Sequence, residues 1–200
     1  ADVDGLRDHV GITLHRQQAV EHAGVVLRDQ VLLDRAARAA EAHGVDEELL
    51  KAVIRQSLGL QITAAAETVA QFEGPSATLL SEVLSTWWQG VYDSPTSGVF
   101  KIVITEVRNF PEIAGFYRQE VVEPGNQLIG RILERGIARG EFRAVDLRST
   151  VMSLILPMVM TCLHKHSLGA CGAQDAQIDP KLFIRQHIEL VLHGLLRPAP

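Results

Sequence analysis

The chain has 200 residues, of which 46% are hydrophobic and 22% are charged, so it can build a real core and is not expected to be globally disordered. This length suits one all-helical unit, or a small domain fused to a larger one. The net charge of -5 at pH 7 means that a DNA-binding protein of this composition would need its basic residues gathered on one face.

Neither secretion nor membrane insertion is indicated by the sequence. Residues 1–10 carry charged side chains throughout, unlike a signal peptide. The longest apolar run, 151–163, is shorter than the roughly 20 residues that span a bilayer, and it contains Pro157. The cysteines, Cys162 and Cys171, do not make a disulfide framework. We therefore expect a cytoplasmic protein that has no membrane partner.

The first 46 residues differ in chemistry from the rest of the chain. Apolar residues at helical spacing predict a helix over 25–43, ended by Gly44. The segment holds five arginines, eight acidic residues and no lysine, a net charge of -3. Phosphate contacts depend on Lys, Arg and small hydroxyl residues, so this composition is poor for DNA binding.

Three helices are predicted over 46–109. The first runs over 46–72, with Asp46 as N-cap and the stripe Leu49, Leu50, Val53, Ile54 and Leu58 on its apolar face. Gly74-Pro75 breaks it. A second helix follows over 76–92, and a third over 96–109 ends before Pro111.

A longer helix is predicted to start at Phe110-Pro111 and to include the stretch 116–143. Apolar residues recur between charges at helical spacing, and Gly140 marks the C-terminal stop. Because an internal proline removes a backbone hydrogen bond, we expect a kink at Pro124, or two helices that meet there.

Two C-terminal helices complete the predicted all-α architecture. Asp146 caps a helix over 147–166 that is apolar almost all round and is therefore expected to be buried on most of its surface. A loop over 167–177 precedes the last helix, which starts at Asp179-Pro180. That helix has two apolar faces, one for its own subunit and one for a partner. We expect Phe183, His187, Leu190 and Gly194 to form the partner face.

The segment from Glu120 to Phe142, EVVEPGNQLIGRILERGIARGEF, closely resembles the C-terminal regulatory domain of TetR/AcrR-family transcription regulators, particularly the AefR-like group. A looser resemblance extends over about 46–198. It implies a TetR-like all-α fold, with a DNA-binding head at 1–46 and a ligand-binding and dimerisation domain at 47–200. The family's helix-turn-helix motif is not recognisable in 1–46, which leaves a divergent head, a replaced or lost head, or a wrongly assigned N-terminal end.

The same resemblance implies an internal cavity for a small apolar or amphipathic effector. Such cavities are mostly apolar and carry a few polar groups that orient the ligand. Ordinary core packing explains large apolar residues equally well. The candidate ligand-binding residues are Trp87, Trp88, Phe100, Ile104, Arg108, Tyr117, Met158 and Cys162.

Other site chemistries have weaker support. Cys162, His164, His166 and Cys171 have side chains of the types that bind metals. On a helix, however, Cys162 and His166 share a face while His164 points away from it. Cationic side chains at the end of a helix explain the pattern better. Arginines recur every fourth residue from Arg131 to Arg143, either as a solvated helix face or as a DNA-binding stripe. No nucleophile motif or phosphate loop is present, so we expect neither enzymatic activity, nor a metal, nor a cofactor.

Two functions fit these observations. The first is a ligand-responsive TetR-like repressor, a homodimer that binds operator DNA and is released by a small apolar effector. The alternative is a dimeric small-molecule-binding module that has lost DNA binding. An enzyme is a third reading, which would require turnover that depends on one polar residue.

Overall fold

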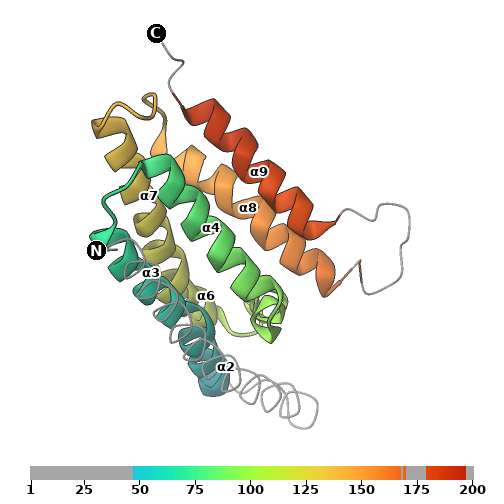
Figure 1. The fold of residues 1–200 in the computed structure, drawn as a ribbon. Coiled ribbons are helices and arrows are strands. Elements are labelled where there is room, and N and C mark those ends of the chain that lie inside the picture. Colours follow the sequence, from blue (N-terminus) through green and yellow to red (C-terminus); the bar gives the residue numbers. More distant parts are fainter. Residues whose placement is uncertain (1–46, 168, 170–178, 197–200) are drawn as a thin grey trace, which may run out of the picture.

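The computed structural model describes residues 47–167, 169 and 179–196, and within these ranges every regular element is a helix. The only pairing of strand type among them is an isolated bridge between Phe142 and Leu196. The helices pack side by side, and the last two, α8 and α9, run together along one side of the body (Figure 1). The predicted all-α class is confirmed.

The first long helix contains one widened turn. It consists of α2 (Glu47–Ile54), the π-helical turn η1 (Arg55–Gly59) and α3 (Leu60–Gln71), which agrees with the helix predicted over 46–72. Its inward residues, Leu50, Ile54, Leu58 and Ile62, are spaced by four. At about 3.6 residues per turn, each such step over-rotates an α-helix by roughly 40°. A π-turn takes up an additional residue, and so it keeps these side chains on the body. Asp46, the expected N-cap, lies outside the described residues.

The second long helix repeats this construction. It consists of α6 (Pro111–Tyr117), the π-helical turn η3 (Arg118–Val122) and α7 (Glu123–Ala138). The helix begins at Pro111, where the sequence predicted that the long helix starts. The predicted irregularity near Pro124 is also present, because the π-turn ends at Val122 and Pro124 lies in the first turn of α7. Gly140, at φ +72°, ends the helix as predicted.

The remaining helices follow their sequence signals closely. α4 (Ser76–Tyr92) has the predicted bounds, and a 3-10 turn η2 (Pro95–Gly98) leads into α5 (Val99–Glu106), which stops short of the predicted end at 109. α8 (Leu147–Lys165) begins where the Asp146 carboxylate accepts a hydrogen bond from the Ser149 amide at 2.8 Å. α9 (Pro180–Leu195) begins after the equivalent cap at Asp179.

Buried side chains form two separate cores. The main core lies among α4, α7, α8 and α9. The second core lies among α2, α5, α6 and the ends of α4 and α8. Fully buried members of the main core are Leu80, Trp88, Ile132, Leu133, Phe142, Leu154 and Met158, and those of the second are Ile54, Leu58, Val91, Val99, Ile113 and Cys162. The two long helices connect the cores.

Gly136 is the position in α7 where a side chain is least tolerated. A β-carbon built there would lie 2.1 Å from the ring of Phe142, which is fully buried. We expect Gly136→Ala to lower the free energy of unfolding by about 2 kcal/mol, because the ring has no room to shift without disturbing the main core. Gly130→Ala on the same helix is the matched control, since its β-carbon meets nothing within 4 Å. Chemical denaturation should show that Gly130→Ala leaves the free energy of unfolding unchanged or raises it. If both variants lowered this free energy equally, the packing described for Gly136 would be contradicted.

Helix α8 is less buried than predicted. Only Val151, Leu154, Met158 and Cys162 are buried, while Met152, Leu156 and Met160 are exposed at 42%, 54% and 62%. The prediction of burial on most of the surface is therefore wrong for a single chain, because α7 and α9 cover one side of α8 only. Among the described residues, α8 is also the one helix long and apolar enough to pass for a membrane span, but its buried residues belong to the two cores.

Candidate functional site

The candidate ligand-binding residues do not form one group. Phe100 and Cys162 are buried in the second core, with Tyr117 packed against it. Trp88 and Met158 are buried in the main core, and Trp87 packs against both cores. Six of the eight residues therefore lie in or against the two cores, and of these Trp87 packs against both.

Trp88 is held firmly within this group. Its indole Nε1 donates hydrogen bonds to Thr161 Oγ1 at 3.0 Å and to the Met158 carbonyl at 3.3 Å. Its ring stacks on Tyr92 at a centroid distance of 4.5 Å, and the Lys165 ammonium lies 4.7 Å from the Tyr92 centroid. Thr161 therefore satisfies the hydrogen-bonding group of the buried indole.

The interior placement of Ile104 and Arg108 is corrected by the structure. Ile104 is 54% exposed and Arg108 is exposed. α5 contributes Val99, Phe100 and Val103 to the second core, which places Ile104 on its outer side, and the helix ends at Glu106, before Arg108.

Two polar side chains in the second core remain uncharged at neutral pH. Burial, with a smaller contribution from the Cys162 thiol, raises the pKa of Tyr117 to about 12. Burial likewise raises the pKa of Cys162 to about 11. Cys162 is therefore a protonated, buried thiol and not a reactive one, and Tyr117 offers a neutral hydroxyl that can orient a polar group of a ligand.

The pocket that the structure describes lies elsewhere. It is an open depression of about 220 Å³ between the first turns of α8 and the end of α9. Ser149, Thr150 and Ser153 line one side, and Val191, Gly194 and Leu195 the other. The depression lies at the surface and includes Gly194 of the predicted partner face. None of the candidate ligand-binding residues lines it.

The histidines near the end of α8 make structural contacts. His166 Nε2 lies 2.7 Å from Ser97 Oγ, and the Lys101 ammonium donates to the His166 carbonyl at 2.7 Å. His164 is exposed. No group of three metal-type ligands occurs among the residues that the structure describes, and Cys171 lies outside them. The cluster joins the end of α8 to η2 and α5.

His166 makes the stability of this joint depend on pH. Burial, assisted by Lys165 and Lys101, lowers the pKa of His166 below its usual 6.5. The folded state therefore favours the neutral ring, so its stabilising contribution is present above pH 6.5 and is lost as the pH falls through the window below it. We expect the melting temperature to fall between pH 7.5 and 5.5 by more in the wild type than in His166→Gln. Parallel pH profiles would contradict this role.

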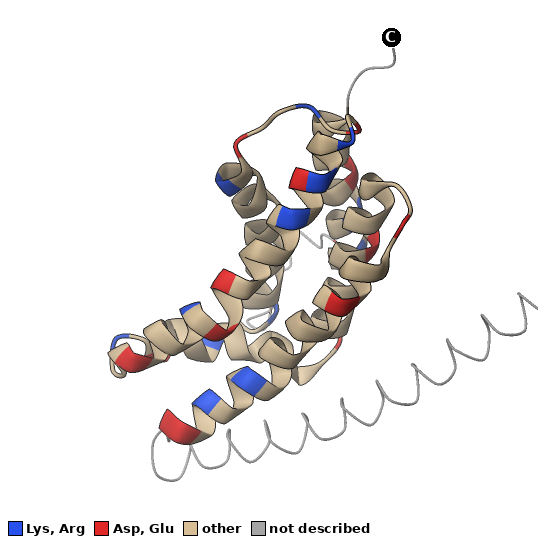
Figure 2. Ribbon diagram, turned by 90° about the vertical axis from the view of Figure 1, so that its left-hand side faces the viewer, with Lys and Arg blue, Asp and Glu red and all other residues tan. Residues whose placement is uncertain are grey.

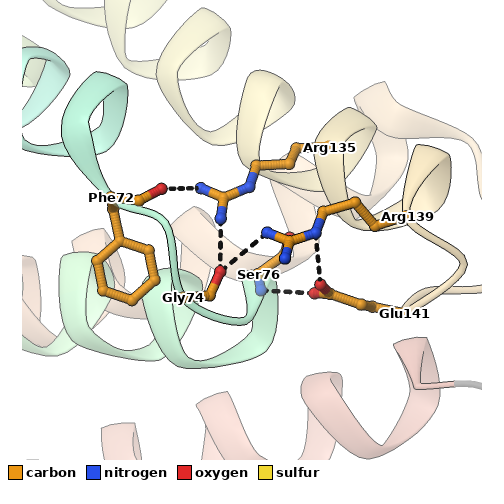
Figure 3. A network of polar contacts seen from close by, with 6 residues as sticks. All are labelled: Phe72, Gly74, Ser76, Arg135, Arg139 and Glu141. Atoms are coloured by element: carbon orange, nitrogen blue, oxygen red, sulfur yellow. Dashed lines mark hydrogen bonds and ion pairs between the residues drawn. The ribbon is translucent and has the colours of Figure 1, made fainter.

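Arginines of the α7 stripe bind backbone carbonyls. The Arg135 guanidinium donates to the Phe72 carbonyl at 2.7 Å and also to the Gly74 carbonyl, to which Arg139 donates at 3.0 Å (Figure 3). These contacts fix the turn between α3 and α4, which we call the elbow (residues 72–76). Further along, Arg143 Nε donates to the Gly194 carbonyl at the end of α9. Arg131, Arg139 and Arg143 are exposed, as a solvated face predicts, but Arg135, Arg139 and Arg143 also bind backbone carbonyls.

Glu141 completes the elbow. Its carboxylate accepts a hydrogen bond from the Ser76 amide at 2.5 Å and pairs with Arg139 Nε at 3.0 Å (Figure 3). Partial burial opposes its ionisation, but the Ser76 hydrogen bonds and the two arginines outweigh this effect, and the pKa of Glu141 is lowered. The carboxylate is therefore charged at neutral pH and secures the first turn of α4.

The predicted partner face of α9 is only partly free. Phe183 packs against the main core and stacks on His187, whose Nε2 lies 3.2 Å from the Leu154 carbonyl. Leu190 is 73% exposed, and a β-carbon at Gly194 would meet nothing. The adjacent α8 adds Met152, Leu156 and Met160 at intervals of four. We call these three residues together with Leu190 the exposed apolar face.

Comparison with known families decides the identity of this helical body. Residues 73–170 match the tetracyclin repressor-like C-terminal domain. The chain belongs to the TetR family. No curated protein matches the chain in a sequence search. The TetR domain match covers α4 to α8. It therefore includes the elbow arginines Arg135 and Arg139, the candidate ligand-binding residues and one helix of the exposed apolar face.

Charge on the described part of this TetR-family body is mixed. Acidic and basic residues alternate along its helices in the view of Figure 2 and do not gather into one basic face.

Proposed function

We propose that this TetR-family protein is a cytoplasmic, ligand-responsive repressor that binds operator DNA as a homodimer and is released by a small apolar or amphipathic effector. Residues 1–46 form its DNA-binding head, and residues 47–200 form its ligand-binding and dimerisation domain. The protein has neither enzymatic activity nor a membrane partner. The exposed apolar face of α8 and α9 is the observation that carries this proposal.

Pairing of two copies through α8 and α9 follows from the energetics of that face. Leu156, Met160 and Leu190 each leave more than half of their surface in water. Burial of apolar surface stabilises association by about 25 cal/mol per Å². Two helices from each copy would form a four-helix interface, and Gly194 would allow close approach of the backbones. Phe183 and His187 would hold α9 in place against α8 beneath this interface, because His187 contacts the Leu154 carbonyl and Phe183 stacks on His187.

The effector is proposed to bind at the junction of the cores. The side chains there are aromatic or sulfur-containing, and Met158 can repack around ligands of different shape. Tyr117 would supply the polar contact through its neutral hydroxyl. Because these residues are packed against one another, entry of an effector requires side chains of both cores to separate.

The effector would act on DNA binding through the helix 47–71. Its first half packs in the second core beside Phe100 and Tyr117, and its end is fixed at the elbow. A ligand shifts the equilibrium only if it binds one arrangement more tightly than the other. Two heads that meet half-sites roughly 34 Å apart would be sensitive to small changes at this helix.

A mobility-shift assay tests the proposal. The probe is the DNA upstream of the protein's own gene, with the full chain at a stated low salt concentration. We expect a shift that survives excess unrelated DNA and weakens when an apolar effector is added. No shift, or a shift that unrelated DNA abolishes equally, would instead favour a dimeric small-molecule-binding module without DNA binding. The net charge of -3 over residues 1–46 is the observation that keeps this second function in view.

A further inference from the structure

All three methionines of the chain lie in α8, at positions 152, 158 and 160. Met158 is fully buried in the main core, whereas Met152 is 42% exposed and Met160 is 62% exposed. At about 100° per residue, Met152, Leu156 and Met160 lie within about 80° of the helix surface, and Met158 lies on the opposite side. The exposed apolar face therefore carries one thioether on each side of Leu156.

A thioether that reaches solvent can be oxidised to a sulfoxide by hydrogen peroxide. The sulfur donates an electron pair to one peroxide oxygen, so that an S–O bond forms and the O–O bond breaks. The proton on the transferred oxygen passes to the second oxygen, which leaves as water. The sulfur loses two electrons to the peroxide. The product is a polar group in place of a flexible apolar one, and methionine sulfoxide reductases reverse the change.

We propose that Met152 and Met160 are sites of reversible oxidation by hydrogen peroxide, and that a chain oxidised at both residues does not pair through the exposed apolar face. The consequence for pairing rests on the proposed function, which joins two copies through α8 and α9. An oxidised chain would then leave operator DNA as a monomer. Peroxide would thus act as a signal separate from the small apolar effector.

Oxidation and pairing compete for the same two side chains. In one chain both thioethers are open to solvent, whereas a second copy seated on the exposed apolar face would cover them. The oxidant therefore acts on the unpaired chains. Once formed, a sulfoxide finds no donor on this face, because the side chains of Leu and Met have no group that donates a hydrogen bond to it. Burial of two such unpaired polar groups from each chain should raise the dissociation constant at least about 100-fold.

Oxidation rates of the three methionines test the assignment of the sites. The full chain is treated with dilute hydrogen peroxide at several protein concentrations, and each methionine is followed by mass spectrometry of peptides. We expect Met152 and Met160 to react at least about ten times faster than Met158, because susceptibility follows exposure. Their rates should fall as the protein concentration rises through the range in which the mass doubles. Equal rates for all three residues, or rates that do not follow the mass, would overturn the proposal.

Sedimentation equilibrium before and after oxidation tests the loss of pairing. The reversal separates methionine from cysteine chemistry, because dithiothreitol alone reduces disulfides and sulfenic acids of Cys162 and Cys171 but leaves sulfoxides. Dithiothreitol alone should leave the mass of one chain, and dithiothreitol with methionine sulfoxide reductases should restore the mass of two. Recovery with dithiothreitol alone would assign the effect to a cysteine and overturn the proposal.

The double variant Met152→Leu/Met160→Leu removes both thioethers and keeps the face apolar. Each variant is compared only with itself, before and after peroxide. The dissociation constant of this variant should change less than about twofold, whereas that of the wild type rises at least about 100-fold. Addition of Ile104→Met to the double variant gives the matched control, because it places an exposed thioether on α5, outside the exposed apolar face. It should be oxidised at position 104 without a change in mass. An equal loss of pairing in these variants and in the wild type would overturn the role of Met152 and Met160.

Failure of this proposal can be distinguished from failure of the proposed function. If the untreated chain is a dimer and keeps that mass after both sulfoxides have formed, only this proposal is wrong. If the untreated chain is a monomer at every concentration, the proposed function and the consequence drawn here for pairing are both wrong.

Discussion

Replacement of Arg135 by alanine is expected to lower the melting temperature by roughly 6–12 °C, which corresponds to a loss of about 3 kcal/mol in a chain of this size. Arg135 donates to two backbone carbonyls of the elbow, and its guanidinium lies 5.7 Å from the centroid of Phe72. Without it, partly buried carbonyls lose charged donors and the end of α3 is no longer fixed to α7.

Two further variants define this prediction. Arg131→Ala removes an exposed arginine one turn earlier in α7 and should change the free energy of unfolding by less than about 0.5 kcal/mol. Arg135→Lys should recover only part of the stability, because an ammonium lacks the planar fork that reaches both carbonyls. Differential scanning calorimetry gives all three values. Equal melting temperatures for Arg135→Ala and Arg131→Ala would contradict the role given to the elbow.

The substitution Leu156→Arg is expected to convert the proposed homodimer into a monomer, with a dissociation constant at least about 100-fold higher. Leu156 is central in the α8 stripe between Met152 and Met160, and is 54% exposed in one chain. An unpaired charge forced into an apolar interface costs several kcal/mol, whereas on an exposed monomer surface it costs almost nothing. Light scattering at several concentrations measures the change, and circular dichroism should show that the helices are retained.

Ile104→Arg is the matched control for this substitution. Ile104 has the same exposed fraction as Leu156, but lies on α5, which contributes no residue to the exposed apolar face. This variant should remain dimeric. If both variants dissociate, or neither does, the exposed apolar face of α8 and α9 is not the interface.

Local signals in the sequence were sufficient for most of the helical framework. Asp146 and Asp179 cap the helices that they were predicted to cap, and Gly140 adopts the positive φ expected of a helix stop. These features depend on a few neighbouring residues, and sequence alone therefore determines them. The π-turns were not predicted, because inward residues spaced by four also fit an ordinary helix until the core that they must face is known.

Long-range features could not be read from the sequence. The carbonyls bound by Arg135 and Arg139 belong to residues about 60 positions away, so a periodic arginine pattern does not reveal them. Ile104 was placed inward because the helical pattern was extended through α5, whose buried side is narrower. The apolar periphery of α8 predicted burial, but what covers Leu156 and Met160 is not a segment among the described residues of the same chain.

The molecular mass in solution tests the central claim most directly, because every functional step proposed for this TetR-family protein requires two copies joined through α8 and α9. Sedimentation equilibrium of the wild-type chain at micromolar concentration should give twice the chain mass of 21.9 kDa. The account would be contradicted if the mass stayed that of one chain up to roughly a hundredfold higher concentration. The free energy of dimerisation would then be weaker than about 5 kcal/mol.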